Sequence, residues 1–255
     1  MFAPGYRNFR KDAKASRKRG DTLRKKVKIG GLDFKEPRIA VTLAGITPKL
    51  LKTARIEGAD IIELRADKMK KPAPARIIKA LDRIRKAGFP SILTIRNREE
   101  GAERHIPDKK RLLLFRQAIK AADAVDIEYF SRDIRDAVIK LARRNRKTVI
   151  VSFHALDSTP SDFLFGRVLK LAFQKKADIV KIAAMANTFD DMVRLSSFTY
   201  DNRNKNIITL SLGQVGRTSR VIFPSLGSIM TYGFVDRPQA PGQMRVSFIK
   251  RLLSA

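Results

Sequence analysis

Eight short runs rich in β-branched and other apolar residues constrain the fold of this chain more than any other feature. The runs are 38–45, 60–67, 91–97, 124–131, 148–156, 178–185, 206–213 and 228–235. Helical segments lie between most of them, and this alternation indicates an α/β fold with a parallel sheet. Eight repeats in about 220 residues favour a closed (β/α)8 barrel over an open doubly wound sheet. The first run lacks a glycine-rich phosphate-binding fingerprint, which also argues against a dinucleotide-binding fold.

Three segments between the runs have the three- and four-residue apolar spacing of amphipathic helices. The predicted buried stripes are Leu112, Phe115, Ile119 and Ala122; Ile134, Val138, Leu141 and Ala142; and Leu164, Val168 and Leu171. Pro107 stands at the expected start of the first helix. Ser131 is a candidate cap for the second.

The chain ahead of the first run divides into two parts. Residues 27–34 alternate apolar and polar positions around Gly30-Gly31, which predicts a hairpin. Residues 1–26 lack apolar periodicity and are rich in Lys, Arg and small residues, which predicts a disordered basic arm. The expected organisation is therefore an arm at 1–26 and a barrel domain at 27–255.

The charge of the chain favours a polyanionic partner. The sequence holds 54 Lys and Arg against 25 Asp and Glu, a net charge of +29. Residues 1–30 contribute 11 Lys or Arg and two Asp, so the arm has the denser charge, but the rest of the chain is basic too. Such a surface attracts nucleic acid or acidic membrane.

The remaining composition favours a soluble cytoplasmic protein. Apolar residues make up 44%, enough for a large core, and there is no cysteine for a disulfide or a thiolate metal site. No apolar stretch approaches the roughly 20 residues that cross a bilayer. The first 20 residues lack the apolar segment of a secretory signal.

Chemically capable side chains occur where the predicted strands end, which is where barrels of this type gather their functional groups. They are Glu63, Arg65, Arg96, Glu99, Glu100, His154 and Lys181. Each alone also fits a structural ion pair or a solvated loop. Their recurrence on one end of the predicted barrel favours a functional site.

Lys181 lies inside the apolar run DIVKIAAM, where burial disfavours the charged ammonium. A neutral amine attacks a ketone to form an imine, so Lys181 is a candidate nucleophile. His154 follows another predicted strand and is suited to shuttle protons beside such a lysine. His105, the second histidine, lies in a charged loop and is expected to be solvated.

Six stretches resemble, in order, those of the type I 3-dehydroquinate dehydratases, the Schiff-base enzymes of the shikimate pathway. They are ELRAD, TIRNREEG, VSFHALDSTP, ADIVKIAAM, GRTSRV and APGQM. The resemblance covers roughly residues 38–250. It implies a (β/α)8 barrel, a homodimer, no metal or organic cofactor, and the dehydration of 3-dehydroquinate to 3-dehydroshikimate by syn elimination.

The resemblance also implies residue roles. Lys181 forms the imine with the substrate ketone, His154 transfers the proton, and Glu100 orients the histidine. The substrate-binding residues that it implies are Glu63, Arg65 and Arg96 for the ring hydroxyls, Arg220 for the carboxylate, and Gln243 on a closing loop. Gln239 stands where many family members have serine, a position at which glutamine can still hydrogen-bond. The arm has no counterpart in the family.

Two other functions fit part of the sequence. A Schiff-base aldolase also uses a barrel lysine, but the order of the other motifs argues against it. An RNA- or ribosome-associated protein on an inherited barrel fits the basic arm, since charge alone gives affinity for phosphate backbones. The joint presence of Lys181, His154, Glu100 and Arg220 favours a working enzyme.

Overall fold

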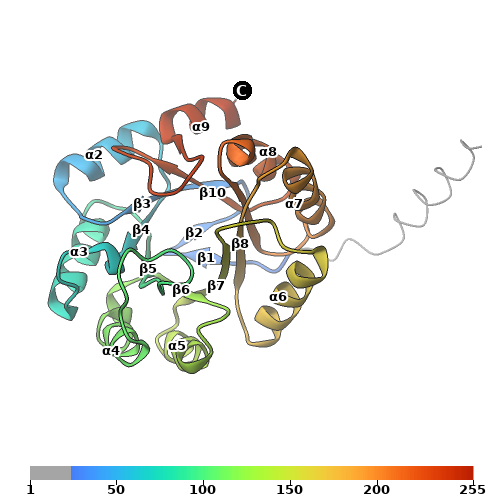
Figure 1. Cartoon of the computed structure of the whole chain (residues 1–255). Helices are drawn as coiled ribbons and strands as arrows, with labels where there is room; N and C mark the ends of the chain where they lie inside the picture. Colours follow the sequence, from blue (N-terminus) through green and yellow to red (C-terminus); the bar gives the residue numbers. More distant parts are fainter. Residues whose placement is uncertain (1–23, 255) are drawn as a thin grey trace, which may run out of the picture.

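The computed structural model describes residues 24–254, which form a ring of parallel strands surrounded by helices (Figure 1). The barrel strands are β3 Arg38–Leu43, β4 Ile61–Arg65, β5 Ser91–Thr94, β6 Ala124–Glu128, β7 Thr148–Ala155, β8 Ile179–Met185, β9 Ile207–Leu212 and β10 Met230–Phe234. Each falls within one of the eight predicted runs. The predicted (β/α)8 barrel is confirmed.

The barrel is held together by parallel pairing in chain order. Pairing runs from β10 through β3 to β9, and a two-residue strand, β11 (Met244–Arg245), adds to the free side of β10. A hydrogen bond from Ile229 N to Ile207 O, 2.9 Å long, joins the segment before β10 to β9. All eight strands therefore end on the same side of the barrel, and the predicted functional groups lie on that side.

Helices cover the outside of the barrel, as Figure 1 shows. They are α2 Pro48–Glu57, α3 Pro74–Lys86, α4 Asp108–Ala118, α5 Arg132–Arg144, α6 Asp162–Gln174, α7 Phe189–Asp201, α8 Ser219–Leu226 and α9 Val246–Leu253, with short 3-10 turns at Ala66–Lys68, Ile119–Ala121 and Val215–Thr218. Pro107 directly precedes α4, as predicted.

Three details of the helix predictions are wrong. Leu112 in α4 and Leu141 in α5 are half-buried rather than buried. In α6 the buried face is Phe165, Val168, Leu169 and Ala172, whereas Leu164 and Leu171 are half-buried. This helix has apolar residues at several phases, so periodicity alone does not fix which face packs inward. Ser131 occupies the cap position of α5, but its hydroxyl does not cap the helix and instead donates to Glu128 Oε2 at 2.6 Å.

The apolar core has two parts. The larger lies between strands and helices, and the smaller fills the barrel interior with side chains from all eight barrel strands, including Ile61, Ile150 and Ile208. The predicted hairpin is confirmed as β1 (Lys28–Ile29) and β2 (Leu32–Asp33). Its Ile29 and the following Phe34 pack into the interior cluster and close the amino-terminal end of the barrel. Thr148 Oγ1 donates to Lys28 O at 2.5 Å and ties the hairpin to β7.

Most of the predicted basic arm, residues 1–23, lies outside the described residues. Residues 24–26 are described and contact the barrel: Arg24 Nη2 donates to Gly227 O at 2.9 Å, and Asn206 Nδ2 donates to Lys25 O at 3.0 Å. The arm therefore joins the barrel at its amino-terminal end, on the side opposite the strand ends with the functional groups. No helix within residues 24–254 is long and apolar enough to cross a membrane.

Candidate active site

A cavity of about 280 Å³ opens at the carboxyl-terminal ends of the strands. All nine predicted site residues line it: Glu63, Arg65, Arg96, Glu100, His154, Lys181, Arg220, Gln239 and Gln243. They come from strands β4, β7 and β8, helix α8, and the loops after β5 and β10. The parallel sheet therefore brings together groups that lie up to 180 residues apart in the sequence.

Lys181 lies at the bottom of this cavity and is 4% exposed. Its Nζ is 3.2 Å from Asp126 Oδ2 and 3.7 Å from Glu63 Oε2, and it lies 4.2 Å from the centre of the Tyr232 ring. Its nearest charged neighbours are thus carboxylates. These contacts hold the amine in one place and leave its approach from the cavity open.

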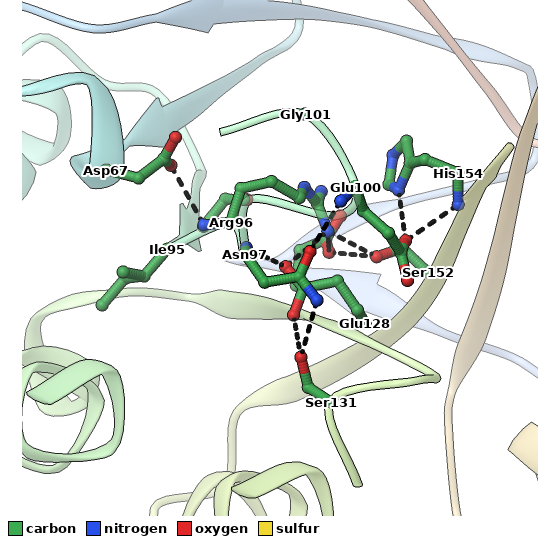
Figure 2. Close-up of polar contacts among 12 residues, drawn as sticks. Asp67, Ile95, Arg96, Asn97, Glu100, Gly101, Glu128, Ser131, Ser152 and His154 are labelled. Atoms are coloured by element: carbon green, nitrogen blue, oxygen red, sulfur yellow. Dashed lines mark hydrogen bonds and ion pairs between the residues drawn. The ribbon is translucent and has the colours of Figure 1, made fainter. Parts of the chain in front are cut away.

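His154 and Glu100 form a pair on one wall of the cavity (Figure 2). Glu100 Oε2 accepts a hydrogen bond from the His154 backbone N at 2.8 Å and lies 3.0 Å from its Nδ1. Burial raises the pKa of Glu100 to about 8, against the lowering effect of the Arg96 charge. Burial also lowers the pKa of His154 well below its usual value, and the charges of Arg96 and Lys181 lower it further.

A buried charge network lies beside the pair (Figure 2). Arg96 Nη1 is 3.0 Å from Glu128 Oε1 and 3.0 Å from Asp126 Oδ1, and it donates to Ser152 Oγ at 2.7 Å. Arg111 donates to the other oxygen of Glu128 and, through Nε, to Ile95 O at 2.9 Å. Every charge in the network has a partner of opposite sign, as buried charges require.

The network fixes the charge state of its members. Burial alone lowers the pKa of Arg96, but the carboxylates of Asp126 and Glu128 outweigh it, and the pKa is raised well above its usual value. Burial raises the pKa of Asp126, but the charges of Arg96 and Lys181 outweigh it, and the pKa lies well below its usual range. The carboxylate beside Lys181 is therefore ionised.

Glu63 and Arg65 are held by separate partners. Glu63 accepts hydrogen bonds from Thr42 Oγ1 at 3.2 Å and Thr94 Oγ1 at 2.6 Å. Arg65 donates from Nε and Nη2 to the two oxygens of Asp67, at 3.0 and 2.8 Å. Glu63 is not paired with Arg65 by any contact in the described residues, so the ion pair considered from the sequence is absent there.

Arg220 differs from the other buried cations. It is 1% exposed, its only hydrogen bond in the described part of the chain goes to Ser211 O at 3.3 Å, and its Nε has no partner. Burial lowers the pKa of Arg220 to about 10. A buried guanidinium without a counter-ion, at the edge of a cavity, is suited to bind an anionic group of a ligand.

The loop between β10 and β11 covers one side of the cavity with Gln239, Ala240, Pro241 and Gln243. Gln243 Oε1 accepts from the Gln239 backbone N at 2.5 Å, and Lys68 Nζ donates to Gln239 Oε1 at 3.2 Å. Lys68 also lies 3.1 Å from Glu103 Oε1, so it connects this loop to those after β4 and β5. The side chain of Gln239 is therefore engaged by the protein.

Several residues of the site were missed by the sequence reasoning. They are Thr42 and Tyr232, which line the cavity, and Asp126, Glu128 and Arg111, which support it. Glu99 and His105, which are exposed, do not line the cavity. No group of three or more His, Cys, Asp or Glu side chains in residues 24–254 is placed to hold a metal ion.

Comparison with known proteins gives a consistent set of relatives. The family model of type I 3-dehydroquinase matches residues 39–255. The 3-dehydroquinate dehydratase of Methanosarcina acetivorans is 35% identical over 237 residues, which are 88% of this chain and 97% of that protein. That of Hydrogenobaculum is 31% identical and covers 84% of this chain and 95% of its own length.

Solved structures agree. The Aquifex aeolicus 3-dehydroquinate dehydratase has a TM-score of 0.77 at 32% identity and covers 84% of this chain and 96% of its own. The Clostridium difficile type I enzyme, solved with covalent modified comenic acid, has a TM-score of 0.83 at 26% identity, with coverage of 91% and 97%. The match over almost the whole barrel, together with the site geometry, leads to one conclusion. The chain belongs to the type I 3-dehydroquinase family.

Proposed function

We propose that this protein dehydrates 3-dehydroquinate to 3-dehydroshikimate in the shikimate pathway, with Lys181 as the imine-forming nucleophile. One observation carries the residue assignment: Lys181, the His154–Glu100 pair and the unpaired Arg220 line a single cavity. They supply a nucleophile, a base with its orienting group, and an anion site, which is the set that an imine-based elimination of a carboxylate substrate needs.

Lys181 Nζ attacks the C3 ketone, and loss of water gives a protonated imine. The imine draws electrons from the adjacent C2–H bond and makes that proton acidic. Ionised Asp126, at 3.2 Å from Nζ, stabilises the positive charge of the imine. The Tyr232 ring, whose centre lies 4.2 Å from Nζ, adds a cation–π contact to the same charge.

His154 removes the C2 proton and returns it to the C1 hydroxyl, which leaves as water. Ionised Glu100 accepts the hydrogen on Nδ1, so that Nε2 is free to act as the base. The lowered pKa of His154 keeps the ring neutral, as a base must be. A second water then hydrolyses the imine, so the net reaction releases one water.

Substrate recognition follows from the charges around the cavity. Arg220 pairs with the substrate carboxylate, which supplies the counter-ion that the guanidinium otherwise lacks. Glu63, Arg65 and Arg96 face the ring hydroxyls. Gln243 and Gln239 lie on the covering loop and contribute to closing the cavity over the substrate.

Borohydride trapping tests the assignment. The protein is incubated with 3-dehydroquinate, reduced, digested and analysed by peptide mass spectrometry, with untreated protein as the control. An adduct on Lys181 is expected, and dehydroshikimate is the expected product without borohydride. Cleavage of a carbon–carbon bond would instead support an aldolase. If no adduct forms and 3-dehydroquinate stays unchanged, neither the dehydratase activity nor the role of Lys181 as nucleophile would hold.

For its oligomeric state we propose a homodimer, as the resemblance to the family implies. Sedimentation equilibrium of the full chain is expected to give twice the monomer mass at micromolar concentration. A monomer mass that persists as concentration rises would exclude the dimer and leave the site, which lies within one chain, unaffected.

A further inference from the structure

Four neighbouring segments at the amino-terminal end of the barrel concentrate positive charge. They are 24–28, which enters the barrel, and the helix-to-strand connections 145–147, 175–178 and 202–206, and together we name them the basal surface. They contain ten Lys and Arg and a single carboxylate, Asp178. The basal surface lies below α5, α6 and α7, which are adjacent in Figure 1.

The cations of the basal surface are mostly exposed and largely without counter-ions. Lys175, which lies 2.6 Å from Asp136 Oδ2, is the only one of the ten with a carboxylate partner in the described part of the chain. Asp178 is already engaged, since Arg143 Nη1 lies 2.8 Å from its Oδ2 and Val149 N donates to the same oxygen at 2.9 Å. The excess positive charge is therefore free to meet an external anion.

The segments also form a hollow. A cavity of about 510 Å³ lies between them, lined by four cations and one carboxylate, Asp178, together with Phe173, Ala177, Asn204 and Asn206. The four cations are Lys25, Arg143, Lys176 and Lys205. Convergence of cations from several parts of the chain on one cavity distinguishes this surface from a helix face with scattered lysines.

Backbone conformation gives an independent observation. Helices α2, α3 and α8 are followed by Gly58, Gly88 and Gly227 with positive φ, the usual way to end a helix. After α5 and α6 the positive-φ residues are Arg146 (φ 56°) and Lys176 (φ 67°). A left-handed conformation costs a residue with a side chain about 1–2 kcal/mol relative to glycine. Cations therefore occupy two strained positions where glycine serves elsewhere in the same barrel.

We propose that the basal surface binds the phosphate backbone of a nucleic acid. The ligand chemistry is a chain of phosphates, because one anion does not use cations spread over four segments. A lipid surface fits less well, since membrane-bound faces insert apolar side chains. None of the exposed large apolar side chains of residues 24–254 lies in the four segments.

The position of the surface separates binding from catalysis. The catalytic cavity opens at the other end of the barrel, so a nucleic acid on the basal surface leaves it accessible.

The test compares two variants with the same reduction in charge. The basal variant is Lys25→Gln, Arg146→Gly, Lys176→Gly and Lys205→Gln in the full chain. The two glycine substitutions remove charge and backbone strain together, so the fold is preserved. The control replaces four exposed cations at the opposite end, Lys70, Lys71, Arg98 and Arg237, by glutamine. Fluorescence anisotropy measures binding of labelled 20-mer uridine RNA and thymidine DNA at several salt concentrations.

The parent and control are expected to bind both oligonucleotides, and the basal variant to bind at least about tenfold more weakly. Its log–log salt slope is expected to be shallower by about 0.7 for each phosphate that the variant no longer neutralises. If both variants lose oligonucleotide affinity equally, the net charge of the protein rather than the basal surface is responsible, and the proposal is wrong. If the parent binds neither oligonucleotide, the proposal is also wrong. Tighter binding to phosphatidylserine vesicles than to either oligonucleotide would assign the surface to lipid. Inhibition of the dehydratase by the RNA would refute the separation of the two ends.

Discussion

The two ends of the barrel use charged residues in opposite ways. The eight strand-to-helix connections at the catalytic end hold nine Lys and Arg against six Asp and Glu, whereas the basal surface holds ten against one. At the catalytic end Lys181, Arg96 and Arg111 are buried and paired with carboxylates. At the basal end most of the cations face solvent. Burial, rather than residue type, therefore separates reactive lysines and arginines from those that attract a partner.

The difference also has a thermodynamic side. Buried charges are costly when a partner is removed, because the remaining charge stays out of water. Exposed cations contribute little stability, so their replacement has a small effect. The same substitution should therefore have large consequences at one end of the molecule and small ones at the other, and the four predictions below use this contrast.

The largest contrast is expected between Lys181→Met and Lys205→Met. Methionine preserves the apolar stem at position 181 but cannot form an imine, so kcat should fall about 10⁴-fold or more. Lys205→Met, at the basal surface, should retain activity within about twofold. The appearance of the conjugated product by ultraviolet absorbance measures both. A Lys181→Met enzyme with more than a tenth of parent activity would contradict the imine mechanism.

Substitution of Lys181 is also expected to affect the fold. Lys181 is buried between Asp126 and Glu63, so its removal takes one partner from a buried pair. Thermal melts of each variant should accompany the rate measurements, so that an effect on the chemistry is distinguished from an effect on the fold.

The second contrast concerns carboxylates. Glu128→Gln removes the charge that faces both Arg96 and Arg111, and should lower the free energy of unfolding by about 3–5 kcal/mol. Asp136→Asn removes the half-exposed partner of Lys175 and should cost less than about 1 kcal/mol. Urea unfolding of the two variants measures the difference, and equal costs would mean that the buried network contributes no more than a surface pair.

The third contrast lies in the pH dependence of activity. Because burial raises the pKa of Glu100 to about 8, the carboxyl gains a proton as pH falls below that value. A protonated Glu100 donates to His154 Nδ1 and leaves the hydrogen on Nε2, which removes the base. The parent kcat/KM should therefore fall up to about tenfold per pH unit below pH 8.

Glu100→Gln sharpens this prediction. The oxygen that accepts from the His154 backbone N is also the oxygen at Nδ1, so a glutamine oxygen there still accepts from Nδ1–H. The variant should have kcat lower by about 10–100-fold but a flat acid side of its pH profile. Measurement of kcat/KM for the parent and the variant from pH 5 to 9 tests this. If kcat/KM of the variant falls at low pH as it does in the parent, the ionisation belongs to another group.

The smallest contrast compares the effect on stability of introducing glycine at a positive-φ position with the effect of replacing a glycine at such a position. Arg146→Gly and Lys176→Gly should each leave the free energy of unfolding unchanged or raise it by up to about 1 kcal/mol. Gly88→Ala, at φ 73°, should lower it by about 1 kcal/mol, because the new Cβ meets only the far end of Arg55 and backbone strain dominates. Destabilisation by the two glycines would mean that the cations stabilise the helix ends.

Much of the fold could be predicted from sequence because barrel strands are short, apolar and regularly spaced, whereas Arg220, Gln239 and Gln243 were proposed only through the resemblance to the family. A parallel sheet places every strand end on one side, so Lys181, His154 and Arg65 could be assigned to one site without knowledge of their contacts. The roles given to them came from motif order, which local periodicity does not supply.

The supporting network was harder to predict. Asp126 and Glu128 alternate within an apolar strand, and this period of two could have identified them as inward-facing. Arg111 is one of 54 cationic residues and lies on a helix where packing decides which face is buried. Its burial depends on the partner, Glu128, which lies 17 residues away and is recognisable only in three dimensions.

The hairpin that closes the barrel has a consequence for the order in which the chain acquires its structure. Lys28 bonds to Thr148, and Arg24 bonds to Gly227, so the hairpin region contacts residues 120 and 203 positions away. Such contacts close long loops and form after local βα units have associated. The hairpin region, although it precedes the barrel strands in the chain, is therefore expected to reach its final position only after the last strands have formed. Hydrogen exchange during refolding should detect protection of Ile29 only when β9 and β10 are already protected.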